Sequence, residues 1–221
     1  LRSAGWLGLL GCGALGAVRA LMPVPTFLEY GAALEAFGGE AEPFFLKEDE
    51  GFALTEAFLT ALERTDCGAV FLCSPNNPTG RLIRPELLEE ICRICHRRGL
   101  RLFVDECFLE LSDGGREASL AGWLDAFSGL FLLRAFTKSY GMAGLRLGYC
   151  LSGDGGLLSA MSRRVQPWNV SLPAQRAGVA ALKEEAFLER SRQLIRRARP
   201  LLAAELEKVG LRVRPSHVNY L

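Results

Sequence analysis

The sequence has 221 residues, of which 49% are hydrophobic and 23% are charged, so it can bury the core of an ordinary globular protein. Its formal net charge of +1 provides no general attraction to nucleic acid or to a membrane surface, and we expect neither as a partner. The seven cysteines are odd in number and scattered, which predicts reduced thiols in a cytoplasmic protein rather than a disulfide framework.

The first stretch of the chain, residues 5–17, is almost free of charge. A signal peptide is one interpretation, but no Met begins the chain and Arg19 leads straight into another apolar run. The stretch is also too short for a membrane span, so it predicts a buried helix. The missing Met indicates that the chain is a fragment.

Further along, short apolar runs alternate with amphipathic stretches. Five runs are predicted as strands: 19–22, 69–73, 101–104, 130–134 and 147–151. Four patterns between them are predicted as helices: 29–37, 54–64, 85–98 and 120–127. Such alternation predicts an α/β fold in which helices flank a mostly parallel sheet, with ligands at the carboxyl ends of the strands.

A long helix is predicted from about residue 186 to 209, and its arginines interleave with glutamates, which favours a solvated face over a nucleic-acid patch. Beyond Gly210, we predict strands at 211–214 and 218–221. The chain therefore divides into a large domain, 1–185, and the incomplete beginning of a smaller C-terminal α/β domain, 186–221.

Two short motifs each have a competing interpretation. Residues 92–96 match the c-type haem attachment pattern, but both cysteines fall on the apolar face of the helix predicted over 85–98, which favours core positions. Gly11, Gly13 and Gly16 loosely fit a dinucleotide-binding loop, yet they precede a predicted strand, whereas that loop should follow one.

Polar residues follow three of the predicted strands. The turn 74–80 is stiffened by two prolines and places Asn76 and Asn77 where amide donors can face a ligand. Asp105 ends a buried strand and needs a partner, for which a protonated ring nitrogen, a salt bridge and a helix cap are all candidates. Lys138 follows the next strand, where a dry pocket would make it a nucleophile, and the fork of Arg146 suits a phosphate.

Taken together and in this order, the motifs resemble the class I and II aminotransferases, a family of fold-type I enzymes that use pyridoxal phosphate (PLP). The resemblance runs from about residue 20 to 221. It is carried by Pro25-Thr26-Phe27, the Asn-Pro-Thr-Gly of 77–80, Asp105-Glu106, Thr137-Lys138 and the Gly-Leu-Arg-Leu-Gly-Tyr of 144–149.

The resemblance implies a role for each matching residue. Lys138 would bind the cofactor covalently as a Schiff base and later move the proton at the substrate carbon. Asp105 would pair with the pyridinium nitrogen and Asn77 with the phenolic oxygen of the ring. Phe27 would stack on the ring face.

The resemblance also implies a site for the cofactor phosphate and a pocket for the substrate. Arg146 would hold the phosphate, with Thr137 as a nearby hydroxyl. Tyr30, one helical turn beyond the stacking aromatic, is a candidate for the substrate pocket. The sequence departs from the family at Phe108, where many members have Tyr, and at Ala135, where Ser or Thr is common.

Within the family, residues 104–109 and 166–170 are similar to the branch that holds threonine-phosphate decarboxylase and histidinol-phosphate aminotransferase. They favour the decarboxylase, an enzyme of cobalamin biosynthesis, and the aminotransferase is the alternative. A non-catalytic fragment of the same fold is a further alternative. The family implies a small-molecule amino substrate and a homodimer, and the sequence suggests no metal site.

Overall fold

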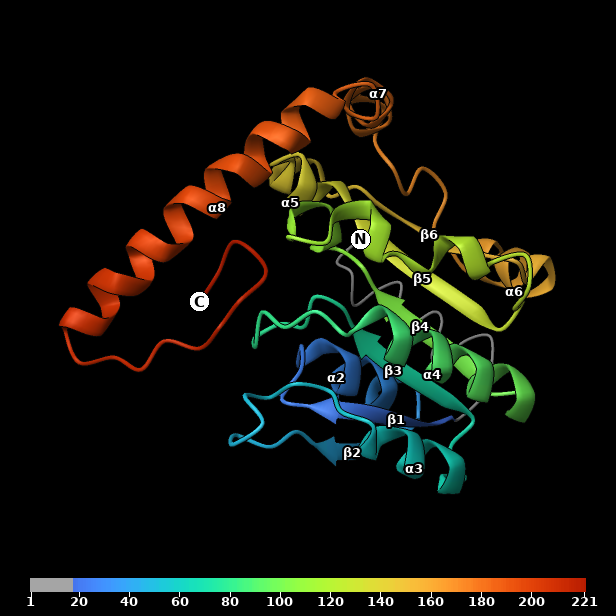
Figure 1. Ribbon diagram of the computed structural model, residues 1–221. Helices are drawn as coiled ribbons and strands as arrows, with labels where there is room; N and C mark the ends of the chain where they lie inside the picture. The colour runs from blue at the N-terminus through green and yellow to red at the C-terminus, as the bar shows by residue number, and fades with distance from the viewer. Residues whose placement is uncertain (1–17) are drawn as a thin grey trace.

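The computed structural model describes residues 18–221, so the helix predicted over 5–17 and the glycine motif of 11–16 lie outside the described residues. Its centre is a six-stranded sheet with strand order β2-β1-β3-β4-β5-β6 (Figure 1). The strands are β1 Arg19–Val24, β2 Glu40–Phe45, β3 Ala69–Cys73, β4 Arg101–Asp105, β5 Leu130–Ala135 and β6 Gly148–Ser152. Neighbouring strands from β2 to β5 are parallel and β6 is antiparallel to β5, which confirms the predicted, mostly parallel sheet.

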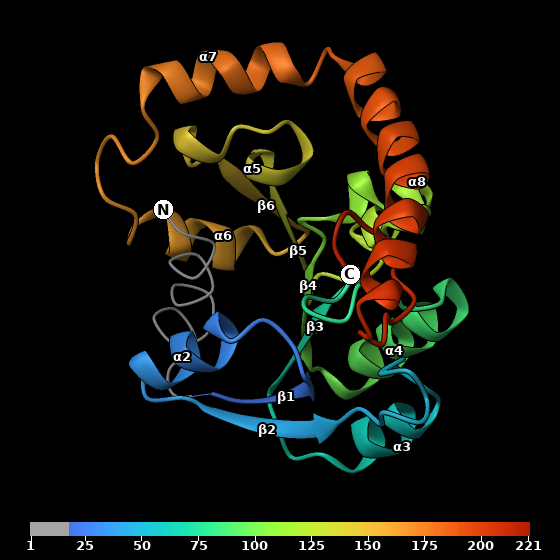
Figure 2. The ribbon, with the colours of Figure 1, turned by 90° about the vertical axis from the view of Figure 1, so that its left-hand side faces the viewer.

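Helices cover both faces of this sheet. They are α2 Glu29–Ala36, α3 Ala57–Arg64, α4 Pro85–Arg98, α5 Phe136–Ser139, α6 Gly155–Ser162, α7 Leu172–Ala181 and α8 Glu185–Lys208. The sheet is sandwiched between α2 and α6 on one face and α3 and α4 on the other, while α7 and α8 extend beyond it (Figure 2). None of the described helices has the length and apolarity needed to cross a membrane.

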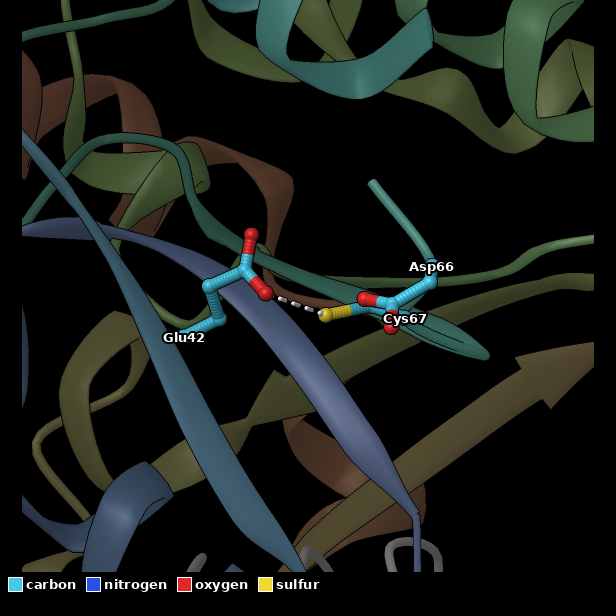
Figure 3. A group of neighbouring side chains, drawn as sticks. All are labelled: Glu42, Asp66 and Cys67. Atoms are coloured by element: carbon cyan, nitrogen blue, oxygen red, sulfur yellow. Dashed lines mark hydrogen bonds between the residues drawn. The ribbon is translucent and has the colours of Figure 1, made fainter. Parts of the chain in front are cut away.

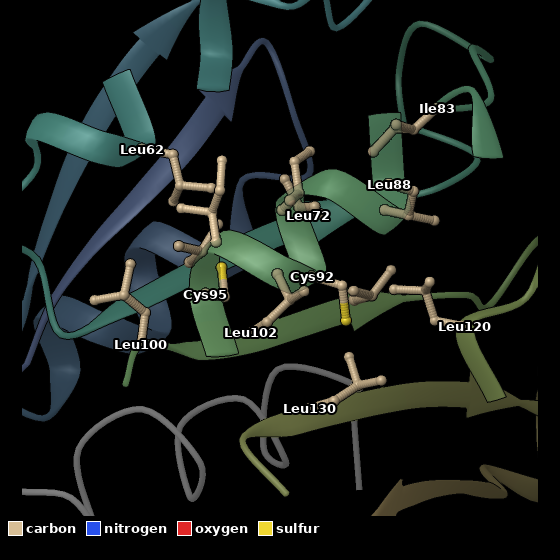
Figure 4. Packing of buried hydrophobic residues seen from close by; sticks show 14 of the residues in the cluster. Leu62, Leu72, Ile83, Leu88, Cys92, Cys95, Leu100, Leu102, Leu120 and Leu130 are labelled. Atoms are coloured by element: carbon tan, nitrogen blue, oxygen red, sulfur yellow. The ribbon is translucent and has the colours of Figure 1, made fainter. Parts of the chain in front are cut away.

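The larger part of the core lies between the sheet and α4 (Figure 4). Helix α4 begins with Pro85 at its first turn and ends at Gly99, which adopts the left-handed conformation with φ 65°. Cys92 and Cys95 are fully buried among leucines of the sheet. Burial therefore confirms that they are core residues, because a haem attached to these thiols would have no room.

The opposite face of the sheet carries a row of stacked aromatic rings. Phe71, Phe103 and Phe131 stand in register on three adjacent strands, with centroid separations of 4.6 and 4.9 Å. Tyr30 of α2 continues the stack at 6.1 Å from Phe71. Side chains two residues apart on a strand point to the same face. Cys73, Asp105 and Leu133, near the carboxyl ends of the same strands, therefore lie on the face that carries the aromatic row.

Several sequence predictions were wrong in detail. Strand β2 was missed because it is an edge strand with acidic residues and an internal proline, and so it lacks the apolar run of a central strand. The helix predicted over 120–127 is only the 3-10 turn Leu120–Trp123. Residues 211–214 and 218–221 are irregular rather than strands. No described strand lies beside them, and some of their backbone groups bond to loops instead.

Candidate functional site

A cavity of about 380 Å³ opens at the carboxyl ends of β3, β4 and β5. It brings together all seven side chains predicted from sequence, namely Phe27, Tyr30, Asn77, Asp105, Thr137, Lys138 and Arg146. The structure thus confirms their convergence on one space. Their individual roles toward a ligand remain predictions.

The floor of the cavity contains Asp105, the last residue of β4, which is only 6% exposed. One carboxylate oxygen accepts a hydrogen bond from the Tyr30 hydroxyl at 2.7 Å, and the other accepts from the backbone N–H of Cys107 at 2.8 Å. The Cys107 bond closes an Asx turn, and the next helical turn, Leu109–Leu111, has Phe108 at its N-cap, so the helix-cap interpretation of Asp105 was wrong. Each carboxylate oxygen has more than one acceptor position, so Asp105 can still accept from an N–H in the cavity.

Tyr30 has a more definite role than the sequence indicated. Its side chain is 1% exposed, and its hydroxyl points to Asp105. Burial raises the pKa of Tyr30 well above its usual range, and the nearby charge of Asp105 raises it further. The phenol is therefore a neutral donor at physiological pH that fixes the orientation of the Asp105 carboxylate.

Lys138 lies in the short helix α5, directly after β5. Its ammonium nitrogen lies 5.1 Å from the centroid of the Phe108 ring, and no described carboxylate lies within ion-pair distance of it. Two thiols share the cavity, but burial raises the pKa of Cys73 to about 12 and raises the pKa of Cys107 well above its usual range, so both stay protonated at neutral pH. The amine of Lys138 is thus the nucleophile best placed to react in the cavity.

Arg146 reaches the cavity from an unusual backbone conformation. It follows the 3-10 turn Ala143–Leu145 with φ 53°, a left-handed geometry that costs a non-glycine residue about 1 kcal/mol. Its guanidinium donates to the backbone oxygen of Ala143 at 3.0 Å, and within residues 18–221 it has no acidic partner. An exposed guanidinium without an acidic partner, lining the same cavity as Thr137, can hold a phosphate group.

Only one of the two adjacent asparagines faces the cavity. The amide of Asn76 donates to the backbone oxygen of Pro25 at 3.0 Å and to the Thr79 hydroxyl at 2.9 Å, and its oxygen accepts from Thr26 at 2.9 Å. Asn76 is therefore structural and ties two loops together. Asn77 alone lines the cavity and remains available to a ligand.

A buried ion pair beside the cavity was not predicted. Glu106, 1% exposed at its side chain, accepts two hydrogen bonds from Arg134 at 3.0 and 2.8 Å. It also accepts from the Ser119 hydroxyl and from the backbone N–H of Leu120. Arg134 lines the cavity, but this pairing occupies its guanidinium. The sequence did show a second acidic residue, Glu106, directly after Asp105. Its spacing from the arginines did not reveal that Arg134 is its partner.

A second group of side chains has a composition that metals favour. Glu42, Asp66 and Cys67 place one potential ligand atom each within 4.8 Å of one another (Figure 3). Arg19 pairs with both carboxylates, at 2.7 Å to Glu42 and 2.6 Å to Asp66, so their oxygens already bond a cation that offsets part of their charge. Asp66 and Cys67 precede β3, away from the strand ends that form the cavity. The group is thus a surface ion-pair network.

The residues around the cavity fit a flat, phosphorylated aldehyde. A buried carboxylate can pair with a ring N–H, an amine can attack the aldehyde, an aromatic side chain can cover the ring, and a guanidinium can bind the phosphate. Pyridoxal phosphate has all of these features.

Comparison with known proteins assigns the family. The model of the class I and II aminotransferases matches residues 3–221, and the chain belongs to this family of pyridoxal-phosphate enzymes. Among its relatives, the threonine-phosphate decarboxylase of Salmonella typhimurium is 35% identical over 92% of this chain and 55% of its own length. A histidinol-phosphate aminotransferase of Methanosarcina mazei is 35% identical over 91% of this chain and 51% of its own length.

Solved structures agree with this assignment. The histidinol-phosphate aminotransferase of Clostridium acetobutylicum superposes with a TM-score of 0.88 at 26% identity, over 98% of this chain and 63% of that chain. The chain spans about half the length of the curated relatives it matches. The predicted α/β fold is thus confirmed.

Proposed function

We propose that this chain forms most of the cofactor-binding part of a PLP enzyme that acts on a phosphorylated amino acid, most similar in activity to threonine-phosphate decarboxylase. One observation carries the proposal: Asp105, which ends β4, lines a single cavity with Lys138 and Arg146, which both lie in the connection between β5 and β6. An acid, an amine and a guanidinium at these positions match the ring nitrogen, the aldehyde and the phosphate of one cofactor.

Each side chain then has a definite task. When bound, pyridoxal phosphate withdraws electrons from the bond that breaks at the substrate α-carbon. Asp105, oriented by Tyr30, supports this withdrawal by accepting the hydrogen bond of the protonated ring nitrogen. The amine of Lys138 would hold the cofactor at its aldehyde carbon, with the aldehyde oxygen released as water, and would then carry the proton to or from the reacting carbon. Arg146 and Thr137 bind the phosphate, and Phe27 covers the ring face.

The choice of reaction depends on which bond of the α-carbon stands perpendicular to the ring. A perpendicular carboxylate bond leads to decarboxylation, and a perpendicular hydrogen leads to amino transfer. The relative in Salmonella typhimurium and the presence of Phe108 in place of the family's tyrosine support decarboxylation. The similarity to histidinol-phosphate aminotransferases in sequence and in structure supports amino transfer as the second candidate.

The experiment has two stages and uses the complete protein. Pyridoxal phosphate is first added to the cofactor-free protein, and we expect an absorption band near the edge of the visible range that Lys138→Ala abolishes. Lys183→Ala is the matched control, because Lys183 lies between α7 and α8 and does not line the cavity. Absence of the band in the unmodified protein would contradict the proposal.

The second stage supplies threonine phosphate and histidinol phosphate separately. Release of carbon dioxide from the first substrate supports the decarboxylase, and transfer of the amino group from the second supports the alternative. We further propose that the protein is a cytoplasmic homodimer, as its family resemblance implies. Sedimentation of the complete protein at twice the mass of one chain would support the dimer, and a monomer would contradict it.

A further inference from the structure

The chain returns to the cavity after its longest helix. Beyond α8, residues 216–220 run back to the loops that follow β3 and β4. The N–H of His217 donates to the backbone oxygen of Gly80 at 2.8 Å, and the oxygen of His217 accepts from the N–H of Asp113 at 3.0 Å. Val218 is fully buried, and its backbone oxygen accepts from Arg199 of α8 at 3.1 Å. This segment therefore joins two loops of the site and α8.

Tyr220 extends the connection to the side chains of the cavity. Its hydroxyl donates to the backbone oxygen of Asn76 at 2.9 Å, the residue directly before Asn77. The Tyr220 ring meets the Phe108 ring edge to face, with centroids 5.1 Å apart and an interplanar angle of 78°. The ammonium of Lys138 lies 5.1 Å from the centroid of the same Phe108 ring. Tyr220 thus contacts Phe108, whose ring lies near Lys138, and Asn76, which directly precedes Asn77.

Phe108 depends on such packing because it has no hydroxyl with which to fix its own orientation. An edge-to-face contact sets both the position and the tilt of a ring. Burial raises the pKa of Tyr220, and the nearby Cys73 and Asp105 raise it further, so its hydroxyl remains a donor across the physiological range. The hydrogen bond to Asn76 and the ring contact to Phe108 therefore persist together.

We propose that Tyr220 is a positioning residue of the site, which holds the Phe108 ring against Lys138 and the Asn76 peptide next to Asn77. The proposal rests on the proposed function, because positioning matters only if Lys138 and Asn77 bind the cofactor. Nothing in the sequence pattern pointed to Tyr220, which lies 144 positions from Asn76.

The two contacts can be separated by two substitutions in the complete protein. Tyr220→Phe keeps the ring and removes the hydrogen bond, and Tyr220→Leu removes both contacts. Leu211→Ala is the control, since Leu211 lies between α8 and this segment, is 55% exposed and does not line the cavity. The measurements are the dissociation constant for pyridoxal phosphate, the pH midpoint of the absorption band of the bound cofactor, and the melting temperature.

We expect Tyr220→Phe to weaken cofactor binding about threefold to tenfold, the usual effect of one neutral hydrogen bond, with an unchanged pH midpoint. Tyr220→Leu should weaken binding further and shift the midpoint, and Phe108→Leu should reproduce that shift. Leu211→Ala should change neither quantity.

If Tyr220 had a purely structural role, Tyr220→Leu would lower the melting temperature without moving the pH midpoint, and that result would overturn the proposal. The same holds if both Tyr220 variants bind the cofactor as tightly as the unmodified protein. An unmodified protein that gives no band would instead overturn the proposed function, so the two failures are distinguishable.

Discussion

Replacing Tyr30 with phenylalanine removes one hydroxyl from a buried contact and leaves the ring in place. The ring keeps its stack on Phe71 and its edge contact with Phe27, so little packing is lost. What is lost is a 2.7 Å hydrogen bond to Asp105, whose carboxylate is 6% exposed and keeps the backbone N–H of Cys107 as a donor. A hydrogen bond to a charged group contributes about 1.5–3 kcal/mol, so we expect the free energy of unfolding to fall by about 2 kcal/mol.

Urea unfolding of the cofactor-free protein, followed by circular dichroism, measures this loss. A double-mutant cycle with Asp105→Ala isolates the contact, and its coupling free energy should be about 1 kcal/mol or more. Tyr140→Phe is the matched control, because within the described residues the buried hydroxyl of Tyr140 has no hydrogen-bond partner. If Tyr30→Phe costs less than about 0.5 kcal/mol and the coupling is near zero, the hydrogen bond does not orient Asp105 as we argue.

Three further predictions concern stability. Arg134→Ala leaves the Glu106 carboxylate, 1% exposed, without its cation and should destabilise the fold by about 3–5 kcal/mol in urea unfolding. Gly80→Ala should cost about 2 kcal/mol or more, because φ is 66° there and a Cβ atom would lie 2.7 Å from the Cβ of Ser216. Burial raises the pKa of Cys73 from 9.0 to about 12, so the free energy of unfolding should fall as pH rises from 9 toward 12, by about 1.4 kcal/mol per pH unit for this thiol.

Each of these has an informative control. Arg93→Ala removes an exposed arginine of α4 and should cost far less than Arg134→Ala, and equal costs would show that burial of the Glu106 pair is unimportant. Gly99→Ala shares the left-handed backbone but meets no neighbouring atoms, so it should cost less than Gly80→Ala. The alkaline slope should be shallower in Cys73→Ala, and an unchanged slope would rule out this thiol as its source.

The sequence by itself determined the central strands and the helix between two of them. The run 69–73 and the pattern 85–98 match β3 and α4 residue for residue, because a fully buried strand and a strongly amphipathic helix each leave a local signature. It also predicted seven of the side chains that line the cavity, since residues at the carboxyl ends of adjacent parallel strands must meet at one edge of the sheet.

Local patterns carried less information at the margins of the fold. Strand β2 is an edge strand, so half of its contacts are with solvent and its composition resembles that of a loop. Residues 211–214 and 218–221 have the composition of strands but lie beside no described strand, and a strand requires a partner for its backbone groups. In both cases the presence or absence of a neighbouring strand, rather than the local residue pattern, decided whether the segment forms a strand.

The tertiary structure alone decided which polar groups pair. Tyr30 and Asp105 are 75 positions apart, and Tyr220 and Asn76 are 144 apart, so no periodicity relates them. Each pair forms because strand order, helix packing and the return of the chain after α8 bring the two groups within hydrogen-bond distance. The sequence therefore specified the chemistry of the site, and packing between distant segments specified how those groups are held.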